Sequence, residues 1–476
     1  MTSVRLGLFS IGLDAYWPQF EGLRERLLGY NQAVARRLER PGVEIVNLGL
    51  IDNPLAAAEA GHQFRRADVD IIFLHVATYA LSSTVLPVVR RAKVPVIILN
   101  LSPGEAIDYA AFNRMGDRGR MTGEWLAWCQ ACPVPEIANV FQRARIAYFE
   151  VTGMLDGDPV AWRDIDEWVD AARVAWVMEH NRLGLMGHYY GGMLDIYSDL
   201  TRQCAGFGGH IEMVEVDELA ALITEVEPEE CAARVALFRD VFDVEPDCSE
   251  RERELARSAR TSVALDRLVA RHALGSLAYY YSGTGNAANE DAIGSIIVGT
   301  SLLTARGVPV AGEYEVKNAQ AMKIMDAFGA GGSFSEYYAC DFRDDVVLLG
   351  HDGPGHIAIA EGKVKVKPLG VYHGKVGSGL SVEMSVRHGA VTLLSVVETP
   401  AGELKLLAAE GESVPGPILE IGNTNSRYRF PMGARRFISE WNAYGPAHHC
   451  AIGVGHIASK IEKLGKLLVF QTARVG

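Results

Sequence analysis

The chain has 476 residues, which at roughly 150 residues per domain predicts about three domains and excludes a small disulfide-stapled module. Hydrophobic residues make up 49% of the chain and charged residues 22%, and this composition excludes wholesale disorder. The 46 Lys and Arg residues are outnumbered by 59 Asp and Glu residues, for a net charge of -13. A negative surface repels phosphate backbones, so we expect no nucleic-acid partner.

The apolar stretches of the sequence are short. The longest, 94–101 and 292–303, do not reach the about 20 residues that a membrane span needs. The segment 1–9 also lacks the basic and long apolar parts of a secretory signal. We therefore expect a cytoplasmic protein with no membrane partner.

The cysteines are odd in number and scattered, which is typical of reduced structural thiols. They are Cys129, Cys132, Cys204, Cys231, Cys248, Cys340 and Cys450. Cys129 and Cys132 have the spacing of a redox or metal pair, but no second such pair completes a zinc site. The sequence therefore favours a structural role for them.

The first part of the chain alternates strand-like and helix-like segments. Strands are predicted at 6–11, 44–50, 71–75, 94–99 and 145–150, and helices at 23–38, 54–67, 84–91 and 162–179. The strands are apolar runs, whereas the helices carry apolar residues at helical spacing. This alternation predicts a parallel sheet with helices on both faces.

The alternation continues in the middle of the chain and then stops. Strands are predicted at 182–186, 211–216 and 277–281, with helices up to His272 and across 291–304. After about Gly332, short strands between Gly and Pro are predicted at 346–349, 356–360, 364–368, 381–387, 391–398 and 403–410. That pattern is typical of a β-barrel or sandwich. We therefore predict α/β domains at 1–175 and 176–332 and a β domain at 333–476.

A glycine-rich segment follows the predicted strand 277–281. Gly283, Gly285 and Ala288 have the spacing of a dinucleotide-binding loop between a strand and a helix. Such a loop also needs an acidic residue about 20 positions further on, and the stretch 302–306 contains none. A glycine-rich turn is the better interpretation.

Carboxylates and imidazoles gather in glycine-bounded turns between 310 and 356 and again near the end of the chain. The segments are AGEYEVK (311–317), GGSFSEYY (331–338), LLGHDGP (348–354) and AHH (447–449). A single Glu or His in such a turn is usually structural. Two carboxylates and two imidazoles together can hold a divalent ion such as Mn²⁺, Mg²⁺ or Co²⁺, although spacing alone does not show that they converge.

These segments, with KPLG (367–370), resemble the L-arabinose isomerase family in order and separation, and the resemblance covers nearly the whole chain. It implies an α/β fold of two Rossmann-like parallel-sheet domains followed by a mainly antiparallel β-barrel domain. It also implies a homo-oligomer with active sites shared between subunits. A divalent metal, usually Mn²⁺, would be held by Glu313, Glu336, His351 and His449.

The resemblance predicts a metal-dependent aldose–ketose isomerase that acts on a free pentose or hexose. A metal that holds the sugar oxygens stabilises an enediolate, while Glu313 and Glu336 serve as base and acid. Which Glu faces C2 is left open, and a metal-assisted hydride shift needs the same ligands. His448 is expected to hydrogen-bond the substrate.

Two assignments near these residues stay open. His356 is an alternative to His351 as a metal ligand, although the match to the family motif favours His351. Glu315 and Lys317 are two residues apart. They can form a local ion pair, support the metal ligands or be solvated.

The sequence departs from the family at the expected sugar pocket. The segments 12–16 and 117–121 replace polar stretches of the family. Asp14, Tyr16 and Arg120 are therefore expected to contact the end of the sugar that is remote from the metal, and a preference other than L-arabinose is expected. Arg114, Arg118 and Arg120 form a basic cluster that either binds an anionic group or is a solvated turn.

Two other functions fit the sequence. One is an isomerase or epimerase of another or acidic sugar, and the other is a non-catalytic sugar-binding protein built on two α/β lobes. The four matched ligand positions favour catalysis, because a binding protein needs neither a metal nor an acid–base pair.

Overall fold

The computed structural model describes residues 3–244, 249–283, 285–372, 375–376 and 379–476. Cys248 and the residue between Gly283 and Gly285 lie outside the described residues. The chain forms two units, Met1–Trp176 and Val177–Gly476. The predicted central and C-terminal domains both lie within the second unit.

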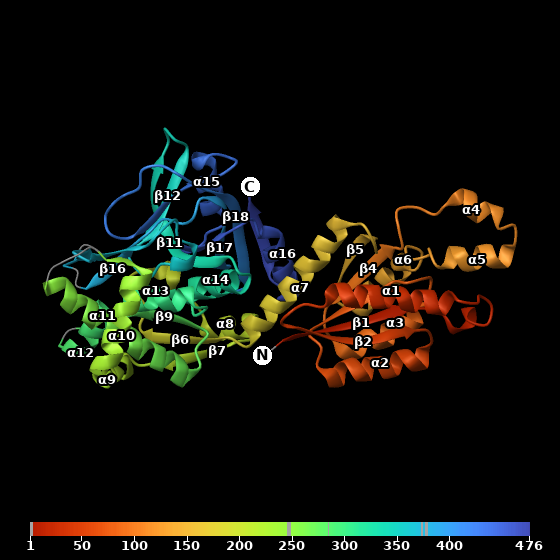
Figure 1. Ribbon diagram of the computed structural model, residues 1–476, viewed down its shortest axis with the longest axis horizontal. Helices are drawn as coiled ribbons and strands as arrows, with labels where there is room; N and C mark the ends of the chain where they lie inside the picture. The colour runs from red at the N-terminus through yellow and green to blue at the C-terminus, as the bar shows by residue number, and fades with distance from the viewer. Residues whose placement is uncertain (1–2, 245–248, 284, 373–374, 377–378) are drawn as a thin grey trace. The chain divides into compact units, whose positions relative to one another are not determined.

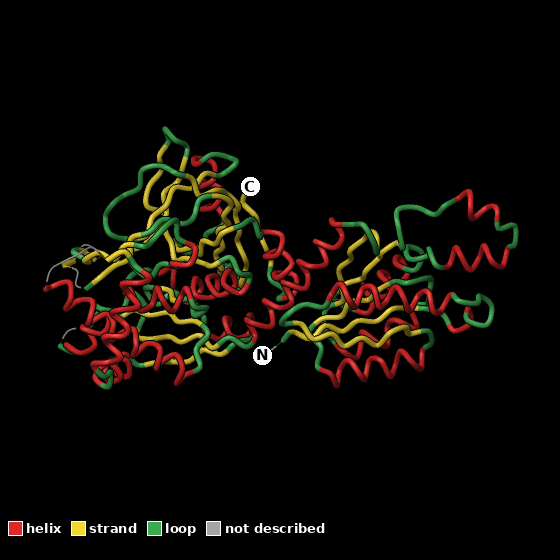
Figure 2. Tube along the Cα trace, in the orientation of Figure 1, coloured by secondary structure: helices red, strands yellow, loops and turns green. Residues whose placement is uncertain are grey.

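A five-stranded parallel sheet forms the centre of the first unit, in the order β2-β1-β3-β4-β5. Its strands are β1 (Val4–Ile11), β2 (Val43–Ile51), β3 (Ile71–His75), β4 (Val96–Ser102) and β5 (Tyr148–Met154). The helices are η1 (Asp14–Tyr16), α1 (Leu23–Leu38), α2 (Pro54–Ala67), α3 (Ser82–Ala92), α4 (Tyr109–Arg114), α5 (Arg118–Leu126), α6 (Val134–Ala144) and α7 (Pro159–Glu179). Figure 2 shows the strands of this unit between helices.

The central strands β1, β3 and β4 are buried on both faces, which explains their apolar runs in the sequence. On one face, Phe64 of α2, Val88 of α3 and Phe141 of α6 share a core with the strands. Trp168 of α7 stacks on Phe149 of β5, with ring centroids 4.6 Å apart. The predicted parallel sheet between helices is therefore confirmed.

The second unit begins with another parallel sheet, in the order β10-β9-β6-β7. Its strands are β6 (Arg182–Gly187), β7 (His210–Val214), β9 (Ser276–Tyr280) and β10 (Val310–Ala311). The helices are η2 (Leu194–Ile196), α8 (Leu200–Phe207), α9 (Val216–Thr224), α10 (Pro228–Val241), α11 (Ser249–His272), α12 (Ala287–Gly294), α13 (Ile297–Ala305) and α14 (Val316–Ala327).

A mainly antiparallel sheet of seven strands follows, in the order β17-β20-β11-β12-β19-β18-β21, and β17 also pairs with β18. Its strands are β11 (Gly331–Asp341), β12 (Val346–His351), β17 (Gly389–Glu398), β18 (Leu404–Val414), β19 (Thr424–Arg429), β20 (His449–Val454) and β21 (Gln471–Val475). Smaller sheets contain β8 (Asp243–Val244), β13 (Lys365–Pro368), β14 (Val371–Tyr372), β15 (Lys375–Val376) and β16 (Leu380–Glu383), and the helices are η3 (Ile357–Ile359), α15 (Ala434–Ala443) and α16 (Ala458–Leu467). The predicted change from parallel to antiparallel sheets is confirmed.

Helix α14 connects the two kinds of sheet in the second unit. It packs against β9 and β10 of the parallel sheet and against β11, β17 and β20 of the antiparallel sheet (Figure 1). Its residues from Val316 to Met325 are all buried. The start of this helix is therefore fixed where the two sheets meet.

Two predicted elements were wrong. The predicted strand at 356–360 is the 3-10 helix η3, closed by the amide of Ile359 on the carbonyl of His356 at 3.1 Å. A three-residue apolar run does not distinguish these structures. The predicted helix at 291–304 divides into α12 and α13 at Ser295, whose hydroxyl bonds to the Asp291 and Ala292 carbonyls at 2.8 and 3.2 Å.

Among the described residues, no helix is both long enough and apolar enough to cross a membrane.

Candidate metal centre

Three neighbouring strands bring Glu336, His351 and His449 together. In the β11–β20 pair, Glu336 lies opposite His449, and in the β11–β12 pair it lies opposite Gly350, the neighbour of His351. His351 ends β12 and His449 begins β20. The antiparallel register therefore places His449 beside Glu336, and the end of β12 brings His351 within reach of both.

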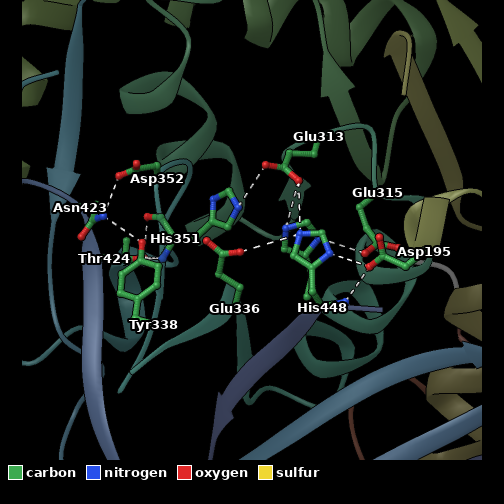
Figure 3. Close-up of polar contacts among 11 residues, drawn as sticks. Asp195, Glu313, Glu315, Glu336, Tyr338, His351, Asp352, Asn423, Thr424 and His448 are labelled. Atoms are coloured by element: carbon green, nitrogen blue, oxygen red, sulfur yellow. Dashed lines mark hydrogen bonds and ion pairs between the residues drawn. The ribbon is translucent and has the colours of Figure 1, made fainter. Parts of the chain in front are cut away.

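Glu313 reaches the same site from the loop between β10 and α14. Its φ is 57° and that of Tyr314 is 63°, a left-handed conformation that is strained for residues with side chains. The Tyr314 amide donates to the Tyr279 carbonyl at 3.0 Å, and the Tyr190 amide donates to the Glu313 carbonyl at 3.4 Å. These contacts hold a turn that directs the Glu313 carboxylate toward the imidazoles (Figure 3).

The Glu313 carboxylate lies between the two imidazoles. Its Oε1 is 3.8 Å from Nε2 of His351, and its Oε2 is 3.3 Å from Nε2 of His449. These three residues are almost fully buried, whereas 29% of the Glu336 side chain is exposed. The cluster therefore has a buried side and an open side, and Glu336 lies on the open side.

The spacing of the side-chain atoms suits one divalent ion. Ligand atoms of Glu336, His351 and His449 lie within 4.8 Å of one another, and so do those of Glu313, His448 and His449. Two ligand atoms on opposite sides of an ion, each at about 2.2 Å, are about 4.4 Å apart. Carboxylate oxygens and imidazole nitrogens suit Mn²⁺, Mg²⁺ and Co²⁺. The two groups share His449 and together include all four predicted ligands, and each group could hold a metal ion.

Burial and neighbouring charges give the two carboxylates different pKa values. Burial alone would raise the pKa of Glu313, but the imidazoles of His448, His449 and His351 hold it well below its usual range. Burial raises the pKa of Glu336, and the opposing effects of His449 and His448 do not cancel that rise. Glu313 is therefore ionised, and Glu336 is the carboxyl group that takes up a proton more readily.

Glu315 supports His449 from behind. Its side chain is fully buried, and its Oε2 lies 3.1 Å from Nδ1 of His449. Because an ionised carboxylate only accepts hydrogen bonds, this contact places a ring proton on Nδ1 and directs Nε2 toward the cluster. Burial lowers the pKa of His449, but Glu313 and Glu315 raise it to about 9. Of the roles left open for Glu315, support of a ligand is the one observed.

Phe334 packs between the two buried imidazoles. Its ring centroid is 4.2 Å from that of His351 and 4.4 Å from that of His449. It lies on β11 two residues before Glu336, so one strand supplies both a carboxylate and the apolar wall of the cluster. This packing restricts the rotation of both rings.

Asp195 holds His448 at the open side of the cluster. Its Oδ2 accepts from the His448 amide at 2.9 Å and lies 2.6 Å from Nδ1 of the ring. Nε2 of His448 is 3.7 Å from Glu313 Oε2 and 3.8 Å from Glu336 Oε2. Burial alone would raise the pKa of Asp195, but contact with His448 lowers it overall. The sequence did not predict a role for Asp195, because its partner His448 lies far away along the chain.

A second polar group borders Glu336. Nδ2 of Asn423 donates to the Tyr338 hydroxyl at 2.9 Å and to Oδ1 of Asp352 at 2.6 Å (Figure 3). Sequence reasoning did not select these residues. Two of them could have been found from their positions next to predicted ligands, because Asp352 follows His351 and Tyr338 lies two residues after Glu336 on β11.

The predicted sugar contacts Asp14, Tyr16 and Arg120 belong to the first unit, whereas the four predicted ligands belong to the second. Asp14 and Tyr16 form the ends of η1. Arg120 lies on α5 and lines a cavity of about 630 Å³ that also contains Arg26 and Glu124. The role of these residues in sugar binding stays a prediction.

His356 does not replace His351. It is buried, but it belongs to neither of the ligand groups found among the described residues. Its amide donates to the Ser333 hydroxyl at 3.2 Å. The structure therefore brings His351, and not His356, to Glu336.

No family model matches the sequence, and a search of curated proteins returns no match. Among solved structures, the chain is similar to a solute-binding protein of an ABC transporter from Burkholderia multivorans, with 11% identity and a TM-score of 0.15 over 65% of this chain and 98% of that chain. It is also similar to a Salmonella D-lactate dehydrogenase, with 12% identity and a TM-score of 0.14 over 68% of this chain and 95% of that chain. TM-scores this low support no inference about function.

Proposed function

We propose that the protein is a metal-dependent aldose–ketose isomerase of the L-arabinose isomerase type, acting on a free pentose or hexose. The observation that supports this most is a pair of overlapping groups, each with one carboxylate and two imidazoles, that share His449. In a metal-dependent isomerase, the ion stabilises charge on neighbouring sugar oxygens and a carboxylate moves a proton between carbons.

The residues of the chain divide this work between them. A divalent ion, Mn²⁺ by preference, would polarise the sugar carbonyl and stabilise negative charge on neighbouring sugar oxygens. Glu313, His351 and His449 would hold it on the buried side, and Glu336 would hold it on the open side. Glu336, with its raised pKa, takes the proton from C2 of the sugar and returns it to C1, while the hydroxyl proton on O2 passes to O1. His448, with 34% of its side chain exposed, hydrogen-bonds a sugar hydroxyl.

We extend the proposal to the rest of the molecule. A homo-oligomer in the cytoplasm would complete each sugar pocket with Asp14, Tyr16 and Arg120 of a neighbouring subunit. The pairing of β17 with β18 supports a barrel-like closure of the antiparallel sheet.

An isomerase or epimerase of another or acidic sugar would use the same ligands. A sugar-binding protein would not need the buried carboxylate of Glu313 beside the buried imidazoles of His351 and His449.

A panel of pentoses, hexoses and sugar acids, each incubated with the protein and Mn²⁺, tests this function. We expect the formation of a ketose from at least one aldose. Formation of an epimeric aldose would identify an epimerase instead. Sugar binding without any conversion would contradict catalysis and favour the binding protein.

Glu315→Gln should lower the affinity for Mn²⁺ by about 10–100-fold, as expected for the loss of a group that orients a metal ligand. The amide keeps the size of the side chain but removes the charge that faces Nδ1 of His449 at 3.1 Å. Isothermal titration with Mn²⁺ measures the change. Glu218→Gln is the matched control, because Glu218 contacts His272 at 2.9 Å outside the cluster. Equal affinities in Glu315→Gln and wild type would show that Glu315 does not support the site.

Metal binding should release at least one proton at pH 7. In the metal-free protein the pKa of His449 is raised to about 9, so the ring is protonated at neutral pH and must lose a proton before Nε2 binds an ion. The apparent affinity should therefore increase with pH, by about tenfold per unit up to about pH 9 for one proton. Titration calorimetry in buffers with different ionisation enthalpies counts the protons. Binding that releases none would contradict ligation by His449.

A further inference from the structure

Asp195 lies on η2 in the connection between β6 and α8, far along the chain from the segments that supply the cluster. Nζ of the buried Lys317, on the first turn of α14, donates to the main-chain carbonyl of Asp195. This contact anchors the main chain at Asp195 and leaves its carboxylate to interact with His448.

One oxygen of Asp195 binds two donors of His448. Oδ2 accepts the amide proton at 2.9 Å and lies 2.6 Å from Nδ1. An ionised carboxylate has no proton to donate, so the proton in the second contact belongs to Nδ1. Two contacts to one residue fix both the position of the main chain and the rotation of the ring.

The opposite nitrogen of the ring points to the open side of the cluster. Nε2 of His448 lies 3.7 Å from Oε2 of Glu313 and 3.8 Å from Oε2 of Glu336 (Figure 3). In a neutral ring with the proton on Nδ1, this Nε2 carries a lone pair and accepts a hydrogen bond. His351 and His449 are 1% exposed, whereas 34% of the His448 side chain is exposed, so solvent and substrate reach His448.

We propose that Asp195 is a positioning residue that fixes His448 in the Nδ1–H tautomer, so that Nε2 accepts a hydrogen bond from a sugar hydroxyl next to the two carboxylates. This inference rests on the proposed function for the identity of the donor. The same logic orients a histidine in other active sites, where a carboxylate bound to one ring nitrogen determines the state of the other. His448 then selects for a hydroxyl donor at this place in the substrate.

The first test is independent of turnover. Ring ¹⁵N chemical shifts of histidine, recorded with Mg²⁺ bound at a pH where the ring is neutral, distinguish the two tautomers. His448→Gln identifies the signal of His448. We expect the Nδ1–H form in the wild type and loss of that form in Asp195→Ala. An Nε2–H form in the wild type, or an unchanged signal in Asp195→Ala, would overturn the proposal.

The second test uses affinity and kinetics. Asp195→Ala and His448→Gln should each bind Mn²⁺ as tightly as the wild type, which also shows that the variants fold. Each substitution should lower kcat/KM by about 10–100-fold. The kcat/KM of the double variant should be no lower than that of His448→Gln alone, because both substitutions remove the same function. Additive losses, or weaker Mn²⁺ binding in either variant, would overturn the proposal, and the latter would make His448 a metal ligand.

The two tests separate this proposal from the proposed function. If no sugar is converted, the isomerase assignment fails, but the tautomer of His448 still decides whether Asp195 positions it. If ketose forms at the wild-type rate in Asp195→Ala, the isomerase assignment stands and the role of Asp195 fails.

Discussion

Glu336→Gln should lower kcat by about 10²–10⁴-fold at saturating Mn²⁺, the range expected for the loss of a general acid–base group. The amide keeps the shape of the side chain and an oxygen for the ion, but it cannot take up a proton. Glu336 is the appropriate target because burial raises its pKa and part of its side chain is exposed to solvent. The rate of ketose formation and the metal content of the same sample measure the effect.

Metal content separates a chemical defect from a binding defect in this experiment. Glu218→Gln, which changes a Glu–His contact outside the cluster, should keep the wild-type kcat. If Glu336→Gln retained a near wild-type kcat with the ion fully bound, Glu336 would not be the proton-transfer group. Glu313 would then be the remaining carboxylate for that role.

His449→Gln should weaken Mn²⁺ binding by more than about 100-fold, a larger loss than is typical for a group outside the ligand sphere. His449 belongs to both ligand groups among the described residues, and it contacts Glu313 at 3.3 Å and Glu315 at 3.1 Å. Its removal also leaves the buried Glu315 carboxylate without the ring that it contacts. Calorimetric titration with Mn²⁺ measures the loss.

His356→Gln is the matched control for this substitution, because His356 is also a buried imidazole of the second unit but lies outside the ligand groups. It should bind Mn²⁺ with the wild-type affinity. A thermal unfolding curve for each variant shows whether the fold is retained. Equal losses of affinity in His449→Gln and His356→Gln would indicate a general effect on packing and would contradict ligation by His449.

The sequence predicted the layers of the fold because apolar periodicity is a local property. Alternating strands and helices indicated the two parallel sheets, and the short strands between Gly and Pro after Gly332 indicated the antiparallel sheet. The 3-10 helix at Ile357–Ile359 and the break at Ser295 were not predicted, because a short apolar run and a single serine hydroxyl carry no periodic signal.

The structure brings together the four residues that were predicted as ligands, and it adds neighbours that the sequence did not predict. Glu313, Glu336, His351 and His449 were found through a resemblance of short motifs, and their convergence depends on a strand register that pairs Glu336 with His449. Such long-range pairing cannot be obtained from the spacing along one strand. Asp195 was missed for the same reason, since its partner His448 lies far away in the sequence.

The charged residues at alternate positions along 313–317 show which contacts could be predicted from the sequence and which could not. Glu313 faces the cluster, Glu315 contacts His449, and Lys317 donates to Asp195. The spacing of two residues was visible, and it suggested a local pair between Glu315 and Lys317 as one possibility. The left-handed turn at Glu313 and Tyr314 leads into α14, and these three side chains have different partners in the structure.

Reconstitution of the chelated protein with Mn²⁺ tests the central claim most directly. Ketose formation from the best sugar of the panel is measured as Mn²⁺ is added, and elemental analysis gives the metal bound per chain. We predict no turnover in the metal-free protein and a rate that increases with bound metal until one ion is held per chain. Full activity in protein that contains no metal would contradict the account.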